Sequence, residues 1–533
     1  MANVLRSMLS ISGATALSRV TGYARTFVQA AVIGTGTRVA EAYTYSNTLP
    51  NQVYELFMGG LLSSIFIPLL IERLTHHGEG DARRLTSALV NVILPFLCVV
   101  ALLGILFASP LINLVTDWKG SSKLTPEEAR RTTELAVLMF RVFALQILFY
   151  GIGALAMGIL NSHRRFLLPA LAPVLNNLLV IASFGGYALL VRSRPDTAIY
   201  ILAFGTTLGV GLMALVLLPS VWRLGYRPRL VYRHPSLLPA VRLAGPMLVF
   251  VAASVGVQLA ANYFGTLFSG VSDLWYAFTI FSLPYGVFVV AIATALMPEL
   301  SERFTLGDTD GYRNTLSFGL RTMAFIVVPA SVGLIAFSRP IIGLLYEHGR
   351  FTAKDTTAVA AILTAFGIGL LGYAAYFILV RSFYSRQNTR TPATLNVVLL
   401  VLYVVLGYVL SRVLGMGLPG VALGFSAAYA ILSIALLAAM RREIKKINGR
   451  QLATSLTKIL LAGTVMYAVA VGGIALLGTG TNTPDRLLIL VLAGGVSLAA
   501  YLVVALLLRT EELGSAVTLL RSRPVKSMRK ERN

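Results

Sequence analysis

The sequence predicts an all-α integral membrane protein with about fourteen transmembrane helices. Its mean hydropathy is +0.77, and hydrophobic residues make up 56% of the chain. Only 13% of the residues are charged, whereas globular domains average about 25%. Apolar runs long enough to cross a bilayer, which takes about 20 residues, recur along the 533 positions. Little of the chain is therefore left for a soluble domain.

Polar breaks divide the apolar runs into fourteen predicted spans. Pro50, Pro284 and Pro329 fall inside spans, and kinked helices are tolerated where neighbouring helices or water satisfy the freed backbone groups. The predicted spans are 7–34, 41–70, 86–109, 133–160, 167–191, 197–221, 241–268, 274–297, 316–345, 358–385, 392–411, 418–440, 455–477 and 487–508.

A helix start is predicted between the third and fourth spans. Thr125 would cap the helix, Pro126 would occupy its first turn, and Glu128 would complete a capping box. We expect a short surface helix at this point of the chain.

The distribution of Lys and Arg predicts the orientation. With the N-terminus inside the cell, the inner segments carry about 30 of these residues and the outer segments about 11. Both termini are therefore expected in the cytoplasm, which requires an even number of spans. The net charge of +23 lies in loops between spans, so it does not indicate a nucleic-acid partner. Residues 511–533 are expected to form a basic cytoplasmic tail near anionic membrane lipids.

An internal repeat predicts two lobes. Three short motifs recur in the same order, and each offset covers six spans, so both halves enter the membrane in the same sense. The matched segments are 67–74 with 297–304, 49–50 with 283–284, and 162–170 with 385–393. We predict a six-helix lobe over 1–225, a second over 226–445 related to it by a pseudo-twofold axis along the membrane normal, and two additional helices within 446–510.

The first predicted span contains two arginines, Arg19 and Arg25, well inside its ends. An arginine at bilayer depth costs roughly 2.5 kcal/mol or more unless it faces a wet cavity or a counter-charge. On an ideal helix the two side chains point some 120° apart. The pair predicts contact with an anionic group that crosses the membrane. The alternatives are pairing with Glu41 or Glu55, or extension of each side chain toward an interface.

Further polar residues fall in or beside the spans. Glu41 is a candidate for substrate or gating contact, or for a helix-start role; Glu55 is a candidate coupling carboxylate or a structural partner for an arginine. Arg141 could extend a basic lining or pack against an acceptor. Gln258 and Asn262 share one helix face, where they could bind a cation through their carbonyl oxygens or hydrogen-bond a neighbouring helix.

The sequence shows no pattern of covalent or metal-dependent catalysis. Its five histidines lie in loops or at span ends, and no Cys/His metal spacing, phosphate-binding glycine loop or Ser–His–Asp set falls in the spans. We therefore expect a protein that is not an enzyme and that holds no metal and no cofactor.

Five groups of motifs between residue 12 and about residue 400 carry a family resemblance. They are 18–25, 49–51 with 61–68, 158–166 with 173–177, 345–352 with Asp355, and 383–392. Together they resemble the MurJ/MviN family of lipid II flippases, within the multidrug/oligosaccharidyl-lipid/polysaccharide exporter superfamily. The chain looks like a divergent member, because Tyr54 and Thr279 stand where the family carries arginines.

The resemblance implies a two-lobe fold in the bacterial cytoplasmic membrane. It also implies export of a polyprenyl-pyrophosphate-linked peptidoglycan precursor by alternating access, with Arg19 and Arg25 in contact with the head group and cell-wall synthesis proteins as partners. The same motifs contribute Ser18 and Asn51 as candidate substrate contacts. Two alternatives stay open: a flippase for another lipid-linked glycan or a small-molecule exporter of the same superfold, and a non-transporting membrane scaffold for cell-wall synthesis.

Overall fold

The computed structural model describes residues 2–55, 66–120, 124–163, 165–227, 229–231, 234–235, 237–445, 448–478, 480 and 482–512. These residues form helices joined by short loops and contain no strand, which confirms the predicted all-α fold class. Apart from its first two residues, the predicted basic tail 511–533 lies outside the described residues.

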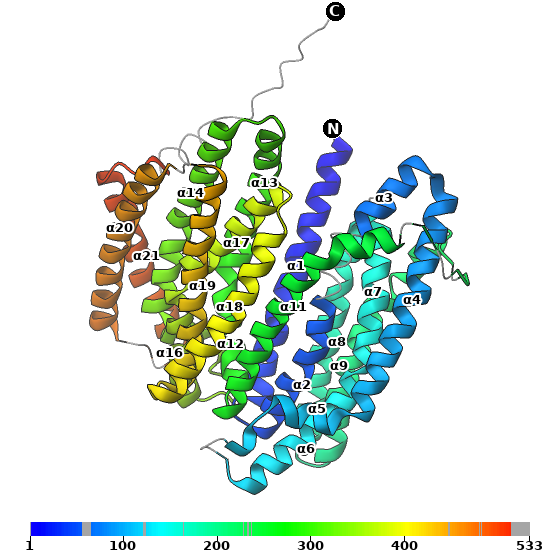
Figure 1. Cartoon of the computed structure of the whole chain (residues 1–533). Coiled ribbons are helices and arrows are strands. Elements are labelled where there is room, and N and C mark those ends of the chain that lie inside the picture. Colours follow the sequence, from blue (N-terminus) through cyan, green and yellow to red (C-terminus); the bar gives the residue numbers. More distant parts are fainter. Residues whose placement is uncertain are drawn as a thin grey trace, which may run out of the picture. The chain divides into compact units, whose positions relative to one another are not determined.

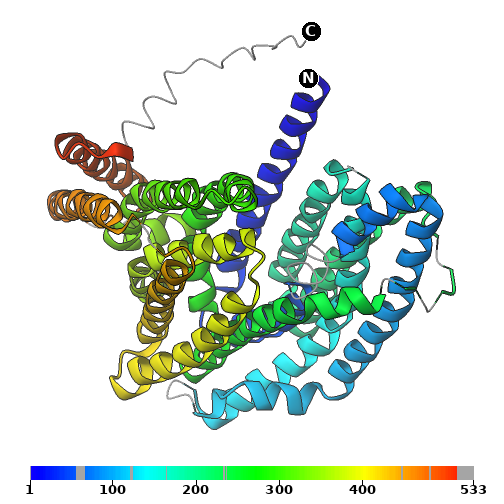
Figure 2. The ribbon, with the colours of Figure 1, turned by 45° about the horizontal axis from the view of Figure 1, so that its top comes forward.

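The chain divides into two compact units. Unit 1 comprises residues 1–276, 345–359 and 389–421, and unit 2 comprises residues 277–344, 360–388 and 422–533. The boundaries of the predicted lobes, 1–225 and 226–445, remain a prediction. Figures 1 and 2 show the order of the helices along the chain.

The first half of the chain forms the following helices: α1 (Ala2–Ile33), α2 (Arg38–Glu55), α3 (Ile67–His76), α4 (Gly78–Leu106), α5 (Ala108–Val115), the 3₁₀ turn η2 (Trp118–Gly120), α6 (Pro126–Phe143), α7 (Leu145–Ser162), α8 (Leu167–Leu190), α9 (Pro195–Leu215), α10 (Leu218–Arg223) and α11 (Leu237–Leu267).

The second half forms α12 (Val271–Pro284), the π-helical segment η3 (Tyr285–Val289), α13 (Val290–Thr305), α14 (Thr309–Ala336), α15 (Ser338–Tyr346), α16 (Ala353–Ile368), α17 (Leu370–Ser385), α18 (Arg390–Tyr408), the π-helical segment η4 (Val409–Val413), α19 (Gly417–Glu443), α20 (Gly449–Leu477) and α21 (Thr483–Leu507).

Eleven helices of the described chain are long and apolar enough to cross a membrane, or twelve when the bent pair α16 and α17 counts as one span. These twelve correspond in order to the third through fourteenth predicted spans. The first two predicted spans correspond to α1 and α2, and residues 56–65 of the second lie outside the described part of the chain. Of the predicted breaks at prolines, the one at Pro284 coincides with a change of helix type, because the π-helical segment η3 follows α12, whereas Pro50 and Pro329 lie inside the uninterrupted helices α2 and α14.

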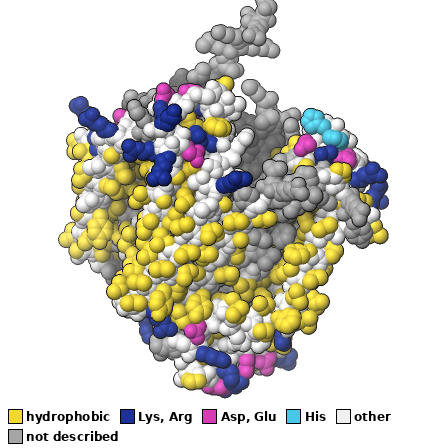
Figure 3. Space-filling model, in the orientation of Figure 1, with side chains coloured by type: hydrophobic (Ala, Val, Ile, Leu, Met, Phe, Trp, Pro, Cys, Tyr) yellow, Lys and Arg dark blue, Asp and Glu magenta, His cyan; other side chains and the backbone are white. Residues whose placement is uncertain are grey.

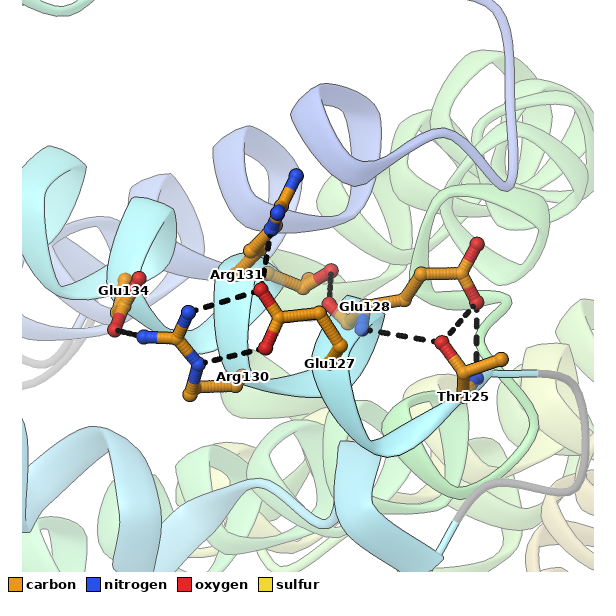
Figure 4. A network of polar contacts seen from close by, with 7 residues as sticks. Thr125, Glu127, Glu128, Arg130, Arg131 and Glu134 are labelled. Carbon is orange, nitrogen blue, oxygen red and sulfur yellow. Dashed lines mark hydrogen bonds and ion pairs between the residues drawn. The ribbon is translucent and has the colours of Figure 1, made fainter.

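The capping box predicted at Thr125 is confirmed (Figure 4). The Thr125 hydroxyl accepts a hydrogen bond from the backbone N–H of Glu128 at 3.3 Å, and the Glu128 carboxylate accepts one from the backbone N–H of Thr125 at 2.9 Å. The expectation of a short surface helix is wrong, however. The helix that starts here runs on through Phe143, because residues beyond its charged first turns are buried against neighbouring helices.

Two clusters of buried hydrophobic residues lie in the described part of unit 1. One gathers side chains of α4, α7 and α9 around Leu97, Leu160 and Met213. The other gathers side chains of α2, α6, α8 and α9 around Tyr45, Phe143 and Phe184. The second cluster surrounds α2, a helix with many polar residues, and so fixes the position of the polar face described below.

In unit 2, α20 and α21 pack along each other. Met466 of α20 and Tyr501 of α21 are buried with Val328 of α14. Over α20, the face shown in Figure 3 is hydrophobic along most of its length and carries Lys and Arg side chains at its upper end. This distribution is that of a membrane-spanning helix with a charged terminus.

Candidate functional site on helices α1 and α2

Helix α1 places its two arginines in different surroundings. Arg19 is exposed and hydrogen-bonds the hydroxyl of Tyr23, one turn further along the helix. Arg25 is half-buried and lies within electrostatic range of the Tyr43 hydroxyl of α2. The separation agrees with the angle of about 120° expected for two residues six positions apart.

Neither arginine forms an ion pair with a carboxylate in the described part of the chain. Pairing with Glu41, which the sequence left open as an alternative, is not observed. The side chain of Glu55, the other alternative partner, lies outside the described residues. Arg19 and Arg25 thus keep guanidinium groups that can receive an anion.

An asparagine of α8 holds the segment of α1 that carries Arg19. The Nδ2 group of Asn177 donates hydrogen bonds to the Ser18 carbonyl at 3.2 Å and to the Thr21 hydroxyl at 3.1 Å. Asn177 is buried, and both of these contacts are partly buried. Ser18 therefore contacts α8 through its backbone, and its predicted role as a substrate contact stays a prediction.

The polar residues of α2 hydrogen-bond the helices around it. Thr44 accepts from Gln29 of α1 at 3.3 Å, Ser46 donates to the Ala136 carbonyl of α6 at 2.8 Å, and Asn51 accepts from the Tyr150 hydroxyl of α7 at 2.5 Å. Interhelical hydrogen bonds of this kind join membrane helices. Asn51, a predicted substrate contact, thus connects α2 to α7 in this structure.

Glu41 caps a distant helix. Its two carboxylate oxygens accept hydrogen bonds from the backbone N–H groups of Val271 at 3.0 Å and Ser272 at 3.2 Å, at the start of α12. A carboxylate at a helix N-terminus satisfies free N–H groups and interacts favourably with the helix dipole. Asp273 in the same turn accepts a hydrogen bond from the hydroxyl of Thr35, so the first turn of α2 and the loop before it are joined to α12 by two acidic side chains.

The loop before α16 supplies residues that the sequence did not single out as site residues. The backbone N–H of Arg350 donates to the Ala31 carbonyl of α1 at 3.0 Å, and its side chain hydrogen-bonds the Tyr187 hydroxyl of α8. The Tyr276 hydroxyl donates to the Gly34 carbonyl at 3.1 Å. The motif 345–352 belongs to the family resemblance, and this was the only sequence signal for the Arg350 contacts; Tyr276 lies on α12, outside every motif of the resemblance.

The remaining predicted site residues lie apart from this group of contacts. Arg141 is exposed in the last turn of α6. Gln258 and Asn262 lie on α11, where Gln258 is half-buried and Asn262 is buried with no hydrogen-bond partner for its Nδ2 atom in the described structure. A pocket of about 660 Å³ lies beside the same stretch of α11, between Leu259 and Leu267, and is also lined by residues of α5 and α18; neither Gln258 nor Asn262 lines it.

The described residues contain no group of three or more His, Cys, Asp or Glu side chains that could hold a metal ion. Gln258 and Asn262 could offer only amide oxygens to a cation. The arrangement on α1 and α2 instead combines interhelical polar contacts of α2 with two guanidinium groups of α1 that form no ion pair with a described carboxylate.

The fold is shared with solved transporters of one superfamily. A structure titled as an inward-facing multidrug resistance MATE family transporter of the MOP superfamily aligns with a TM-score of 0.65 at 15% identity, over 79% of this chain and 94% of that one. At this identity the likeness concerns the fold alone. The chain is therefore a membrane protein with the fold of this transporter class.

Sequence comparison identifies the family within that class. The profile of the lipid II flippase MurJ family matches residues 29–492, and the chain belongs to this family. The lipid II flippase MurJ of Burkholderia cenocepacia is 31% identical over 78% of this chain and 79% of its own length, and the probable lipid II flippase MurJ of Vibrio cholerae is 28% identical over 96% and 98%. A lipid II flippase MurJ structure in an inward closed conformation aligns with a TM-score of 0.76 at 26% identity, over 94% of this chain and 98% of that one.

Proposed function

We propose that this protein moves lipid II, the polyprenyl-pyrophosphate-linked peptidoglycan precursor, from the inner to the outer leaflet of the bacterial cytoplasmic membrane by alternating access. Membership of the lipid II flippase family supports this function. The structural observation that carries it is the pair Arg19 and Arg25, which lie on α1 and form no ion pair with a described carboxylate.

The chemistry of the two side chains suits a pyrophosphate. Each guanidinium group is planar, permanently charged and able to donate two parallel hydrogen bonds to phosphate oxygens. A pyrophosphate diester carries at least two negative charges, which two arginines would roughly neutralise. Because the two side chains point in different directions from α1, they would contact the head group from two sides rather than as one clamp.

The other candidate residues have supporting roles in this proposal. Ser18 and Asn51 would contact the head group or hold the helices that do, and Glu41 would fix the first turn of α2 to α12. Glu55 and Arg141 would adjust the charge around the site. Gln258 and Asn262 are proposed as a cation site, formed through their carbonyl oxygens.

The proposed orientation places both termini in the cytoplasm, as the excess of Lys and Arg in the inner loops predicts. The lipid-linked sugar pyrophosphate and the surrounding membrane lipids are the expected partners, with cell-wall synthesis proteins as further partners. The proposal requires a transporter, not an enzyme, because the cargo is moved without covalent change.

Replacement of both Arg19 and Arg25 by Ala tests the function. The double variant is expected to insert and fold, to lose transport of lipid II in proteoliposomes, and to leave lipid II on the cytoplasmic leaflet when it replaces the parent protein in cells. A matched control is the double variant Arg84→Ala and Arg441→Ala, which removes two exposed arginines of other helices. This control should transport at the parental rate.

The same experiment separates the alternatives. A scaffold would retain its cellular role in the Arg19 and Arg25 double variant, and that result would contradict the proposal. A flippase for a different glycan would instead show, on depletion, accumulation of another lipid-linked precursor on the inner leaflet.

A further inference from the structure

A polar pocket lies beside α14, at the start of α20 and after the end of α21, within unit 2. It has a volume of about 380 Å³, and its lining combines three cationic with two anionic side chains. The charged lining residues are Arg321, Arg450, Lys458, Glu511 and Glu512. None of these belongs to the site on α1 and α2.

Two carboxylates and one guanidinium of the pocket lining pair with each other; Arg321 and Glu512 are buried and Glu511 is exposed. Arg321 of α14 pairs through Nη1 with Glu511 Oε2 at 2.5 Å and with Glu512 Oε1 at 3.2 Å. Ser455 of α20 donates a further hydrogen bond to Glu512 Oε1 at 2.8 Å. The residues that follow α21 are thereby fastened to α14 and α20.

This arrangement leaves one buried carboxylate oxygen without a partner. Glu512 is only 5% exposed, and its Oε2 atom accepts no hydrogen bond in the described structure, while the Nε of Arg321 donates none. A buried charged oxygen without a donor is unfavourable by several kcal/mol, so such atoms normally have a partner. Glu512 lines the pocket, so a small rotation of its almost inaccessible carboxylate would bring Oε2 to a donor there, and a positively charged donor would interact most strongly.

The rim of the pocket has the opposite charge. Arg450 is exposed in the first turn of α20, and Lys458 lies two turns further along, where its ammonium group donates to the Arg509 carbonyl at 3.4 Å and lies within electrostatic range of Glu511. These two cations would attract a phosphate group. A ligand that matches both Glu512 and the rim carries an ammonium group and a phosphate.

Apolar side chains beside the pocket face outward. Leu460 and Leu461 follow Lys458 on α20 and are 46% and 52% exposed, and Leu506 and Leu507 end α21 at 61% and 77%. Since α20 and α21 are long and apolar enough to span a membrane, these leucines offer acyl chains a surface next to the polar pocket.

We propose that this pocket binds a phosphoethanolamine group, supplied by phosphatidylethanolamine of the membrane. The ammonium would donate to Glu512 Oε2, the phosphate would contact Arg450 and Lys458, and the acyl chains would lie along the exposed leucines. The bound lipid would fasten α20 and α21 to α14 at the membrane surface.

Lipid binding to the delipidated full chain, measured by native mass spectrometry, tests this site. Phosphatidylethanolamine is expected to bind about tenfold more tightly than phosphatidylcholine, because the trimethylammonium of the latter has no N–H to donate. Glu512→Gln should bring this ratio close to one. Arg450→Ala should weaken both lipids by similar factors and keep the ratio, whereas Arg442→Ala, an exposed arginine of α19 outside the pocket, should change neither.

Several results would overturn the proposal. Equal binding of the two lipids, with no effect of Arg450→Ala, would mean that only water fills the pocket. Tighter binding of phosphatidylglycerol than of phosphatidylethanolamine would indicate a simple anion site. Displacement of the lipid by an equal concentration of soluble phosphorylethanolamine would indicate that the ligand is a soluble cytosolic compound and not a membrane lipid. Should Glu512→Gln fail to fold, the ratio for the parent protein and the exposed variant Arg450→Ala still decide the outcome.

Discussion

The carboxylate of Glu41 accepts a hydrogen bond from the backbone N–H of Val271 at 3.0 Å, although the two residues are 230 positions apart in sequence. Glu41 is 2% exposed, and its other oxygen accepts from the next N–H of the same turn. An acidic residue in α2 therefore serves as the N-terminal cap of α12. This use of the charge explains why a glutamate is tolerated in the interior of the protein without a basic partner.

Glu41→Gln is expected to destabilise the protein. The amide has one acceptor oxygen instead of two and no charge, and its NH₂ group would face a backbone N–H. We expect a loss of roughly 1–3 kcal/mol, seen as a lower midpoint of thermal unfolding in nanodiscs. Glu134→Gln on the exposed face of α6 is the control and should leave the midpoint unchanged. Equal midpoints for both variants would show that the cap contributes nothing.

Two glycines of unit 1 form a matched pair for a second prediction. Gly349 and Gly36 both have φ of +65°, a conformation that disfavours any residue with a Cβ. A Cβ at Gly349 would lie 2.3 Å from the Ala31 carbonyl oxygen, whereas a Cβ at Gly36 would meet nothing within 4 Å. We expect Gly36→Ala to lose about 1–2 kcal/mol from the backbone conformation alone, and Gly349→Ala to lose clearly more.

Thermal unfolding of the two alanine variants measures this difference directly. The excess loss in Gly349→Ala reports how rigidly the loop before α16 is held against the end of α1. Losses of the same size in both variants would mean that the loop moves away from Ala31 without penalty.

A third prediction concerns the hydrogen bonds of Asn177 to α1. Asn177→Ala removes the donor to Ser18 and Thr21 and should lower both stability and lipid II transport, because the adjacent Arg19 is then less firmly positioned. Asn396→Ala is a close control, since Asn396 of α18 donates in the same way to the Phe250 carbonyl at 2.6 Å and the Ser254 hydroxyl at 2.8 Å of α11.

Both asparagine variants are expected to lose about 1–2 kcal/mol of stability, as measured by thermal unfolding. Transport by proteoliposomes, normalised to folded protein, should fall further in Asn177→Ala than in Asn396→Ala. If the two transport rates fall equally, Asn177 stabilises the fold without positioning Arg19.

The sequence predicted those features that depend on local patterns. The long apolar runs predicted the helices from α4 onward, and the spacing of Thr125 and Glu128 predicted the capping box of α6. Arg19 and Arg25 were visible because a charge inside an apolar run is unusual. Each of these signals lies within one segment of the chain.

Contacts between distant segments could not be predicted in this way. A helix capped by its own N-cap residue has a recognisable spacing, but α12 is capped by Glu41 of another helix, for which no spacing exists. The partners of Asn51 and Asn177 likewise follow from packing and not from neighbouring residues. Gly349 is visible in the sequence only as a glycine, and its closeness to Ala31 requires the folded chain.

The last prediction concerns pH and Asp308, which caps α14 outside the membrane-spanning segment. Its carboxylate accepts from the Gly311 N–H at 2.8 Å and from Arg303 at 2.8 Å, and these contacts hold the pKa of Asp308 below its ordinary value. The stability that this cap contributes is therefore complete above the unfolded pKa of about 3.9 and is lost as pH falls through the lower folded pKa. As the pH falls through this lower pKa, amide exchange in the first turn of α14 should accelerate relative to its intrinsic rate. Asp308→Asn, a neutral cap, should abolish this acid dependence, whereas Asp310→Asn in the same turn should retain it; an unchanged profile in Asp308→Asn would assign the titration to another group.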